Sequence, residues 1–183
     1  MAIVTTASAG MKAAGRSTIL QVRSPLSTAH ATELETIALV ASSPVPVIVS
    51  SRCDIALAAG AAGVNLPEND IPVAAARALM GERMVGRSVH TLESALRAEG
   101  EGADYVIFGP VWTSASHPAS TPAGIKALAE VAHALRIPVL AIGGVTEERI
   151  AECHAAGAAG YAAIRLFTSP RNLRFRGDPG EFE

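Results

Sequence analysis

Aromatic side chains are scarce in this chain of 183 residues, where they make up 4% of the sequence and include one tryptophan. Hydrophobic residues still account for 49%, and the mean hydropathy is +0.31, so the core must be built from Ala, Val, Ile and Leu. Small aliphatic side chains of this kind are typical of parallel strands that lie buried beneath alanine-rich helices.

Positive charge is also in short supply, because 15 Lys and Arg residues face 17 Asp and Glu residues. The resulting net charge of −2, with no dense run of Lys and Arg, predicts that nucleic acid is not a partner. No apolar stretch reaches the roughly 18 residues that a membrane span needs, and residues 1–10 lack the pattern of a secretory signal. We therefore expect a cytosolic (cytoplasmic) protein with no membrane partner.

Cysteine is nearly absent as well. The two cysteines, Cys53 and Cys153, lie far apart in the sequence and match no CxxC spacing. We expect two reduced, partly buried thiols, and we expect no metal site built on them.

Short apolar runs recur along the chain with helical patterns between them, which is typical of repeated βαβ units. Glycine ends three of the helical patterns just before the next run, at Gly60, Gly102 and Gly157. Eight strands are expected, near residues 2–5, 18–23, 45–49, 63–66, 84–88, 105–108, 139–142 and 160–163.

Eight similar strands, with no glycine-rich dinucleotide turn after the first, favour a closed α/β barrel, the (β/α)₈ or TIM barrel, over an open doubly wound sheet. Residues 1–183 then form one compact domain, with residues 168–183 as an irregular tail. The first unit is the weakest, because residues 6–17 are few and rich in Gly and Ala, so we expect the barrel to be open or frayed there.

The carboxyl ends of the strands carry the working residues in such barrels, and phosphate commonly binds at the loops after strands seven and eight. Gly143 and Gly144 follow the seventh expected strand, where backbone amides without side chains can approach an anion. Arg165 follows the eighth strand and adds a positive charge. These three residues are the predicted phosphate-binding site.

Other polar residues follow the second and fifth strands. Gln21 and Arg23 point to the same side by strand alternation, and Ser88 and His90 close the fifth strand, so all four are predicted to bind substrate. Asp70, in the fourth loop, is interpreted as a helix N-cap.

The sixth loop, residues 109–122, is the longest, and its length is typical of a lid or binding loop. It contains His117 among small hydroxyl side chains. An imidazole can both accept and donate a proton near neutral pH, so His117 is the predicted catalytic residue. Ser114 and Ser116 are predicted to bind substrate beside it.

The sequence resembles the thiamine-phosphate synthase and TenI family of (β/α)₈ proteins over nearly its whole length. The resemblance is carried by residues 20–23 (LQVR), 51–57 (SRCDIAL), 86–93 (GRSVHTLE), 103–111 (ADYVIFGPV) and 141–145 (AIGGV). Synthases of this family join a pyrimidine diphosphate to a thiazole phosphate. They hold Mg²⁺ and the diphosphate with an Asn-Asp pair after strand three, an Asp in the next loop, and lysines in loops two and six.

This chain departs from the synthase pattern at several of those positions. Ser50 and Ser51 stand where the family has the Asn-Asp pair, and Asp70 keeps the carboxylate of the next loop. Pro25 and His117 stand at the two lysine positions. The resemblance therefore implies less charge to neutralise a departing diphosphate.

The TenI branch resembles residues 86–90 more closely, and its characterised activity is a thiazole tautomerase that needs no metal or other cofactor. The family's best-known tautomerase has its catalytic histidine directly after the loop-six glycine, where this chain has Pro110. Our hypothesis at this stage is that His117 transfers the proton instead, while Arg23 and the phosphate-binding residues hold a phosphorylated thiazole.

Two alternatives remain open. One is a thiamine-phosphate synthase with an altered magnesium site, and the other is a non-catalytic barrel that binds thiazole or thiamine phosphates. A partner subunit covering the poorly helical tail would make the protein a homo-oligomer, such as a dimer.

Overall fold

The computed structural model describes residues 1–24, 26–113 and 121–168, and every structural statement below concerns these residues. Eight parallel strands alternate with helices and form one sheet in the order of the sequence. The strands are β1 (Ala2–Val4), β2 (Leu20–Val22), β3 (Val47–Ser50), β4 (Gly63–Leu66), β5 (Met84–Val89), β6 (Tyr105–Phe108), β7 (Val139–Ile142) and β8 (Gly160–Ala162). The helices are α1 (Ala7–Ala14), α2 (Ala29–Ser42), α3 (Cys53–Ala58), α4 (Val73–Met80), α5 (Leu92–Gly100), α6 (Gly124–Ala134), the short 3₁₀ helix η1 (Glu147–Arg149), α7 (Ile150–Ala155) and α8 (Arg165–Thr168).

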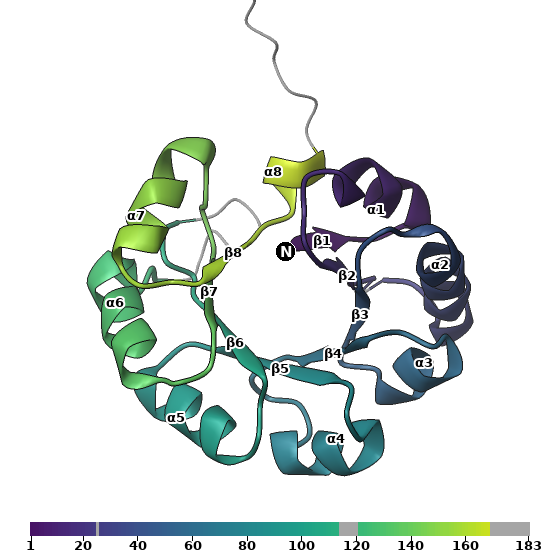
Figure 1. The fold of residues 1–183 in the computed structure, drawn as a ribbon, viewed down its shortest axis with the longest axis horizontal. Coiled ribbons are helices and arrows are strands. Elements are labelled where there is room, and N and C mark those ends of the chain that lie inside the picture. Colours follow the sequence, from purple (N-terminus) through teal and green to yellow (C-terminus); the bar gives the residue numbers. More distant parts are fainter. Residues whose placement is uncertain (25, 114–120, 169–183) are drawn as a thin grey trace, which may run out of the picture.

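The strands curve into a ring with the helices around its outside, as Figure 1 shows. β8 meets β1 through a parallel bridge between Ala2 and Ala163, and Ile3 donates its amide proton to the Ala163 carbonyl over 3.0 Å. The predicted (β/α)₈ barrel is confirmed. The closing seam is a single bridge, whereas each of the other neighbouring strands pairs over three or four positions.

The first unit carries a covering helix, α1, despite its richness in Gly and Ala. The Thr6 hydroxyl caps this helix by accepting a hydrogen bond from the Ala9 amide over 3.2 Å. A Cβ atom at Gly10 would lie 2.6 Å from Cδ1 of Leu39 on α2, so the missing side chain is what allows the two helices to approach. The first unit is therefore covered by a short helix that its small residues let pack closely, while the seam beside β1 remains the weakest pairing of the ring.

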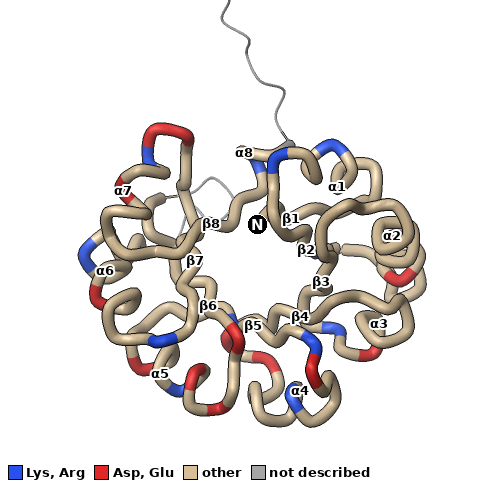
Figure 2. The backbone as a smooth tube through the Cα atoms, viewed as in Figure 1, with Lys and Arg blue, Asp and Glu red and all other residues tan. Residues whose placement is uncertain are grey.

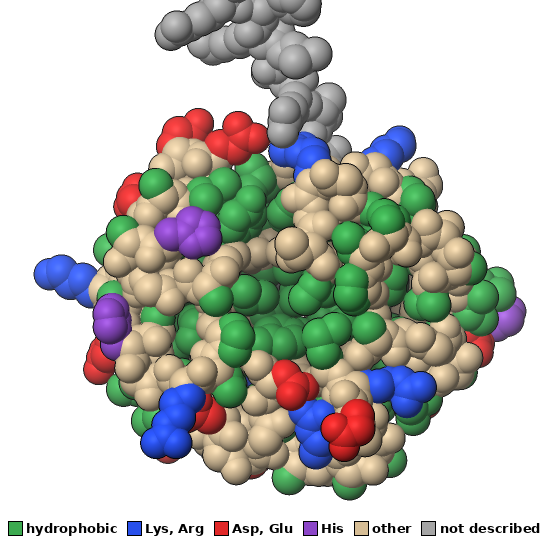
Figure 3. Space-filling view, in the orientation of Figure 1, with side chains coloured by type: hydrophobic (Ala, Val, Ile, Leu, Met, Phe, Trp, Pro, Cys, Tyr) green, Lys and Arg blue, Asp and Glu red, His purple; other side chains and the backbone are tan. Residues whose placement is uncertain are grey.

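The core has two layers. One buried cluster joins side chains of β1, β3, β6 and β8, including Ile3, Ile48 and Ile107, and strands so far apart around the ring can meet only in its interior. The larger clusters lie between the strands and the surrounding helices. In the space-filling view, the middle of the ring is hollowed and lined by hydrophobic side chains (Figure 3).

Charged residues lie mainly on the outer helices and loops, while the barrel wall is largely uncharged (Figure 2). Polar groups that face the barrel interior therefore stand out against an apolar background.

None of the helices within the described ranges combines the length and the hydrophobicity that crossing a bilayer requires.

Candidate functional site

Polar side chains line the barrel near the carboxyl ends of β3, β4 and β5. Ser50 and Asn65 are register partners on β3 and β4, and the Asn65 side-chain amide donates a hydrogen bond to the Ser88 hydroxyl on β5 over 3.0 Å. Because that bond uses the nitrogen of the amide, it leaves Oδ1 of Asn65 as a free acceptor. Asn65 was not among the predicted site residues, although its position in the fourth strand could have revealed it.

Two further buried oxygens face the interior without a partner. Gln21 lies on β2 between Ile3 and Ile48 of the neighbouring strands, and its Oε1 has no hydrogen-bond partner among the described residues. The same holds for the Tyr105 hydroxyl on β6 and for Oδ1 of Asn65. Buried oxygens of this kind are costly unless a ligand or water supplies a donor, so they mark the interior as a place where polar groups bind.

Ser51 and Asp70 meet at the mouth of the barrel from the loops after β3 and β4. The Ser51 hydroxyl donates a short hydrogen bond to Oδ2 of Asp70, while Oδ1 of Asp70 accepts the amide proton of Ile71 over 2.7 Å. Ser51 has φ of +68°, a left-handed conformation that is uncommon outside glycine and recurs at functional sites.

The interpretation of Asp70 as a helix N-cap is wrong. Helix α4 begins at Val73 with Pro72 at its cap position, and the Val73 amide donates to a carboxylate oxygen of Glu101 instead. Asp70 lies in the loop before that helix, where its carboxylate accepts hydrogen bonds from Ser51 and from the Ile71 amide.

Magnesium is the metal that the family resemblance implies, and the donor set at Ser51 and Asp70 can be tested against it. Both residues offer oxygen, which suits Mg²⁺, an ion commonly held by one or two carboxylates together with substrate phosphates. No cluster of three or more His, Cys, Asp or Glu side chains with metal-binding geometry occurs in the described part of the chain. Ser51 and Asp70 therefore fit Mg²⁺ in donor chemistry, and an ion held there would need further ligands from outside the protein.

Arg87 fixes the loop that carries Asp70, and it was missed in the sequence. Its guanidinium donates to the carbonyl oxygens of Pro67 over 2.7 Å and Ile71 over 2.9 Å. Arg87 is buried, and this burial lowers the pKa of its guanidinium. Since it holds both sides of the loop, Arg87 sets the place of the Asp70 carboxylate.

His90 lies at the mouth, as predicted, and contacts two neighbouring loops. Its Nδ1 makes a short hydrogen bond with the Gly109 carbonyl, which can only accept, so Nδ1 carries the proton. Its backbone amide donates to Glu68 over 3.1 Å, and Nε2 lies 3.7 Å from the other oxygen of that carboxylate. The Nε2 side of the ring therefore faces the Glu68 carboxylate.

Gly143 and Gly144 form the turn after β7, with φ of +89° and +67°. A Cβ atom at Gly143 would lie 2.5 Å from Cβ of Pro110, and one at Gly144 would lie 2.7 Å from the Thr113 carbonyl oxygen. Both positions therefore require glycine, for backbone conformation and for close contact with the start of the sixth loop.

Two predicted arginines follow strand ends. Arg23 comes directly after β2, where its amide donates to the Val4 carbonyl over 2.8 Å, and its side chain is half-buried. Arg165 begins α8, directly downstream of β8, and is exposed. Neither has an ion pair with the described residues. His117, Ser114 and Ser116 lie outside the described residues, as does Pro25.

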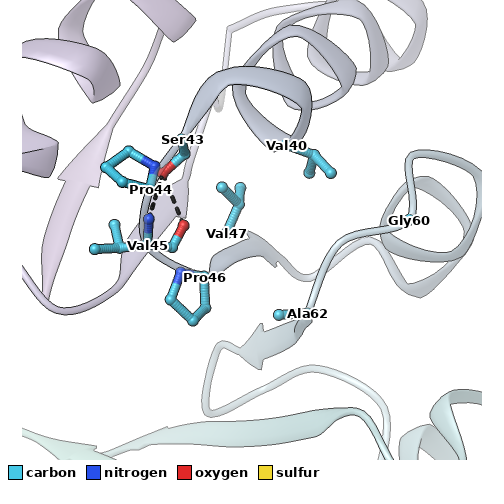
Figure 4. Close-up of a pocket in the computed structure, with 8 residues that line it drawn as sticks. All are labelled: Val40, Ser43, Pro44, Val45, Pro46, Val47, Gly60 and Ala62. Carbon is cyan, nitrogen blue, oxygen red and sulfur yellow. Dashed lines mark hydrogen bonds between the residues drawn. The ribbon is translucent and has the colours of Figure 1, made fainter.

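The cavity in Figure 4 lies away from these residues, at the amino-terminal end of the barrel. It has a volume of about 350 Å³ and lies between the end of α2, the start of β3 and the turn before β4. Val40, Val45 and Val47 give it an apolar lining, with Ser43 bonded to the backbone of Val45. It offers no charged group for a phosphorylated ligand.

Comparison with known proteins identifies the family. A model of the thiamine monophosphate synthase family matches residues 3–167. This chain belongs to that family.

The names of similar proteins are consistent with this family assignment. The thiamine-phosphate synthase of Anaeromyxobacter dehalogenans is 49% identical over 120 residues, covering 64% of this chain and 54% of that protein. The thiamine-phosphate synthase of Chloroflexus aurantiacus is 41% identical over 121 residues, covering 66% of this chain and 56% of that protein. The match thus spans little more than half the length of these relatives.

A solved structure extends the likeness to nearly the whole fold. Thiamine phosphate pyrophosphorylase from Pyrococcus furiosus superposes with a TM-score of 0.84 at 27% identity, covering 94% of this chain and 89% of that one.

The names of these relatives contradict the hypothesis of a metal-free thiazole tautomerase, and with it the assignment as an isomerase. The hypothesis rested on missing metal ligands and on the likeness of residues 86–90 to the TenI branch, whereas relatives at 41% and 49% identity are named as synthases.

Proposed function

We propose that this protein is a transferase of the thiamine-phosphate synthase type, which joins a pyrimidine diphosphate to a thiazole phosphate and releases diphosphate. The family match over residues 3–167, shared with relatives named as synthases, is the observation that carries the proposal. The oxygen pair of Ser51 and Asp70 supports it, because it lies at the barrel end where the family holds its diphosphate.

The phosphorylated ligand is assigned to the loops after β7 and β8. Amides of the Gly143–Gly144 turn approach the phosphate, and Arg165 and Arg23 contribute positive charge from the rim. Gln21 and Ser88, as predicted, and Asn65 offer hydrogen bonds to a heteroaromatic ring entering the barrel. The free acceptors on Gln21 and Asn65 would be satisfied by donor groups of that ring.

Ser51 and Asp70 would hold Mg²⁺, which neutralises the negative charge that develops on a departing diphosphate. Arg87 keeps Asp70 in place through the Pro67 and Ile71 carbonyls. Because Ser50 and Ser51 replace the family's Asn-Asp pair, we expect the ion to bind more weakly than in a two-carboxylate site. A cytosolic location, a single domain and self-association remain parts of this proposal.

Release of diphosphate from the two substrates tests the proposal. We expect release with Mg²⁺ and none after chelation. The substitution Asp70→Asn should lower the rate by roughly a hundredfold or more, since it removes the carboxylate for the ion. Asp54→Asn is the matched control, because Asp54 is an exposed carboxylate in the first turn of α3 that is bonded to Arg52, and its rate should equal that of the parent.

Absence of release under all these conditions would contradict the proposal. If thiazole phosphate then still raised the melting temperature, the protein would instead be a non-catalytic barrel that binds the product or a substrate.

A further inference from the structure

Arg149 connects the loops after β6 and β7, and it has no part in the site described above. Its Nη1 donates a hydrogen bond to the Gly144 carbonyl over 2.7 Å. Its guanidinium carbon also lies 4.9 Å from the centre of the Trp112 ring, within the range of a cation–π contact. One side chain on η1 thus holds the glycine turn and the start of the sixth loop together.

The backbone of the two loops is paired at the same place. Val111 donates its amide proton to the Ile142 carbonyl over 2.8 Å, and Trp112 donates to the Gly143 carbonyl over 3.0 Å. With Gly144 in contact with the backbone of residues 112 and 113, the turn and the loop form one packed unit. Arg149 adds a side-chain contact to this unit through the Gly144 carbonyl and the Trp112 ring.

The guanidinium of Arg149 has no close ion-pair partner among the described residues, and its charge interacts with the Glu148 carboxylate only beyond ion-pair distance. Arg16, Arg52 and Arg77, by contrast, each have a close ion-pair partner. A cation that is bound to a carbonyl oxygen and an aromatic ring keeps its full charge, which favours an anion at the adjacent turn.

We propose that Arg149 is the positioning residue of the phosphate site. By holding the Gly144 carbonyl and stacking on Trp112, it fixes the peptide units of the Gly143–Gly144 turn in the orientation that an incoming phosphate meets. A preorganised turn loses less conformational entropy on binding, so it binds phosphate more tightly. The inference rests on the phosphate site of the proposed function and assigns that site's rigidity to Arg149 and Trp112.

Arginine is required for this role because its planar group stacks and donates at the same time, which an ammonium group cannot do. Phosphate affinity should therefore depend on the shape of the side chain at position 149 as well as on its charge. Arg149→Met and Arg149→Lys separate the two, since only the lysine keeps the charge.

Calorimetric titration with inorganic phosphate and with thiazole phosphate tests the inference. We expect Arg149→Met to raise the Kd for both ligands about tenfold, and Arg149→Lys to raise it about fivefold, on the scale of one charged hydrogen bond. Trp112→Leu should have an effect like that of Arg149→Met. The double variant should bind phosphate no more weakly than either single variant, because both substitutions break the same contact.

Trp112 supplies a second readout, as it is the single tryptophan of the chain. Phosphate should change the fluorescence of the parent protein, and the change should saturate at a higher phosphate concentration in Arg149→Met. In the transferase assay this variant should raise the KM for thiazole phosphate while kcat stays the same, a division that general loss of structure would not produce.

Three results would overturn the inference: unchanged phosphate affinity in Arg149→Met, full affinity in Arg149→Lys, or no phosphate binding by the parent protein. If Arg149→Met fails to fold, Arg149→Lys and Trp112→Leu decide the question by the same titration. Failure of the proposed function is distinct from these results. A parent that binds phosphate through Arg149 but releases no diphosphate would support the inference and contradict the transferase.

Discussion

Individual residues of the barrel interior combine burial with unused polar atoms. Gln21 and Asn65 are each 2% exposed, yet each keeps one oxygen without a hydrogen-bond partner among the described residues. An uncompensated buried oxygen costs about 1–3 kcal/mol, so a fold that retains several must recover the cost when it binds a ligand or water. We interpret Gln21 and Asn65 as ligand contacts and Tyr105 as a third polar group deeper in the same interior.

Tyr105 also makes stability depend on alkaline pH. Burial raises the pKa of its hydroxyl well above the usual value, with the nearby Asp104 carboxylate adding to the effect. Below the pKa of about 10 in the unfolded chain this group is neutral in both states. Above it, only the unfolded chain loses the proton, so the free energy of unfolding falls by up to about 1.4 kcal/mol per pH unit.

Chemical denaturation between pH 8 and pH 11.5 measures this dependence. Tyr105→Phe should flatten the alkaline decrease relative to the parent, and at pH 7 it should be at least as stable, since the unpaired hydroxyl is gone. Equal slopes for the two proteins would show that Tyr105 ionises freely in the folded state.

At the scale of elements, the loops after β6 and β7 are the part of the mouth that sequence alone describes least well. The glycine pair was predicted as an anion turn, but its contact with residues 110–113 depends on the adjacency of β6 and β7. Likewise Arg87, on β5, acts on the loop after β4 because those strands are neighbours in the sheet. Such pairs of elements are specified by packing rather than by any local motif.

Gly144→Ala should destabilise the protein by about 2 kcal/mol or more. The new Cβ would meet the Thr113 carbonyl oxygen at 2.7 Å, and φ of +67° is unfavourable for alanine. Gly15→Ala is the control, because Gly15 ends α1 at φ of −69° with nothing within 4 Å of a Cβ atom. It should leave stability unchanged or raise it by about 0.4–1 kcal/mol.

Urea denaturation gives both values. Similar losses in the two variants would mean that the glycine turn is not held against the sixth loop.

At the scale of the whole molecule, the closed ring of strands and helices determines how the buried cysteines become accessible to solvent. Cys53 on α3 is 7% exposed and Cys153 on α7 is fully buried, in the layer between helices and barrel. Burial raises the pKa of both thiols, and the carboxylates of Asp70 and Glu152 raise that of Cys53 and Cys153 respectively. Both cysteines were predicted to be partly buried, and both are buried as free thiols in the core.

Thiol labelling at pH 8 should therefore follow global unfolding. We expect both cysteines to react slowly and together, with the denaturant dependence seen by circular dichroism, because reaction needs an exposed thiolate. Ala151→Cys places an exposed thiol on the same helix as Cys153 and should react at once. Fast labelling of Cys53 or Cys153 in native buffer would instead indicate local opening of α3 or α7.

The sequence by itself determined the barrel and its eight strands, because hydrophobic periodicity and glycine stops are local signals. It also predicted Ser88, His90 and the Gly143–Gly144 turn at the carboxyl ends of β5 and β7, whereas Gln21 lies in the middle of β2, in register with the first residues of β4 and β5. The tautomerase hypothesis was wrong because it gave single missing ligands and the local likeness of residues 86–90 more weight than a resemblance spread over the whole chain.

Only the tertiary structure decided which loops act on one another. Asp70 bonded to Ser51, Arg87 beneath the Asp70 loop and Arg149 between Trp112 and Gly144 all join residues whose neighbourhood comes from the order of strands around the ring. Closure of the ring brings residues that are far apart in the sequence into contact, and the sequence pattern alone does not give the distances between them. That is why the chemistry of single loops could be predicted from the sequence and the contacts between loops could not.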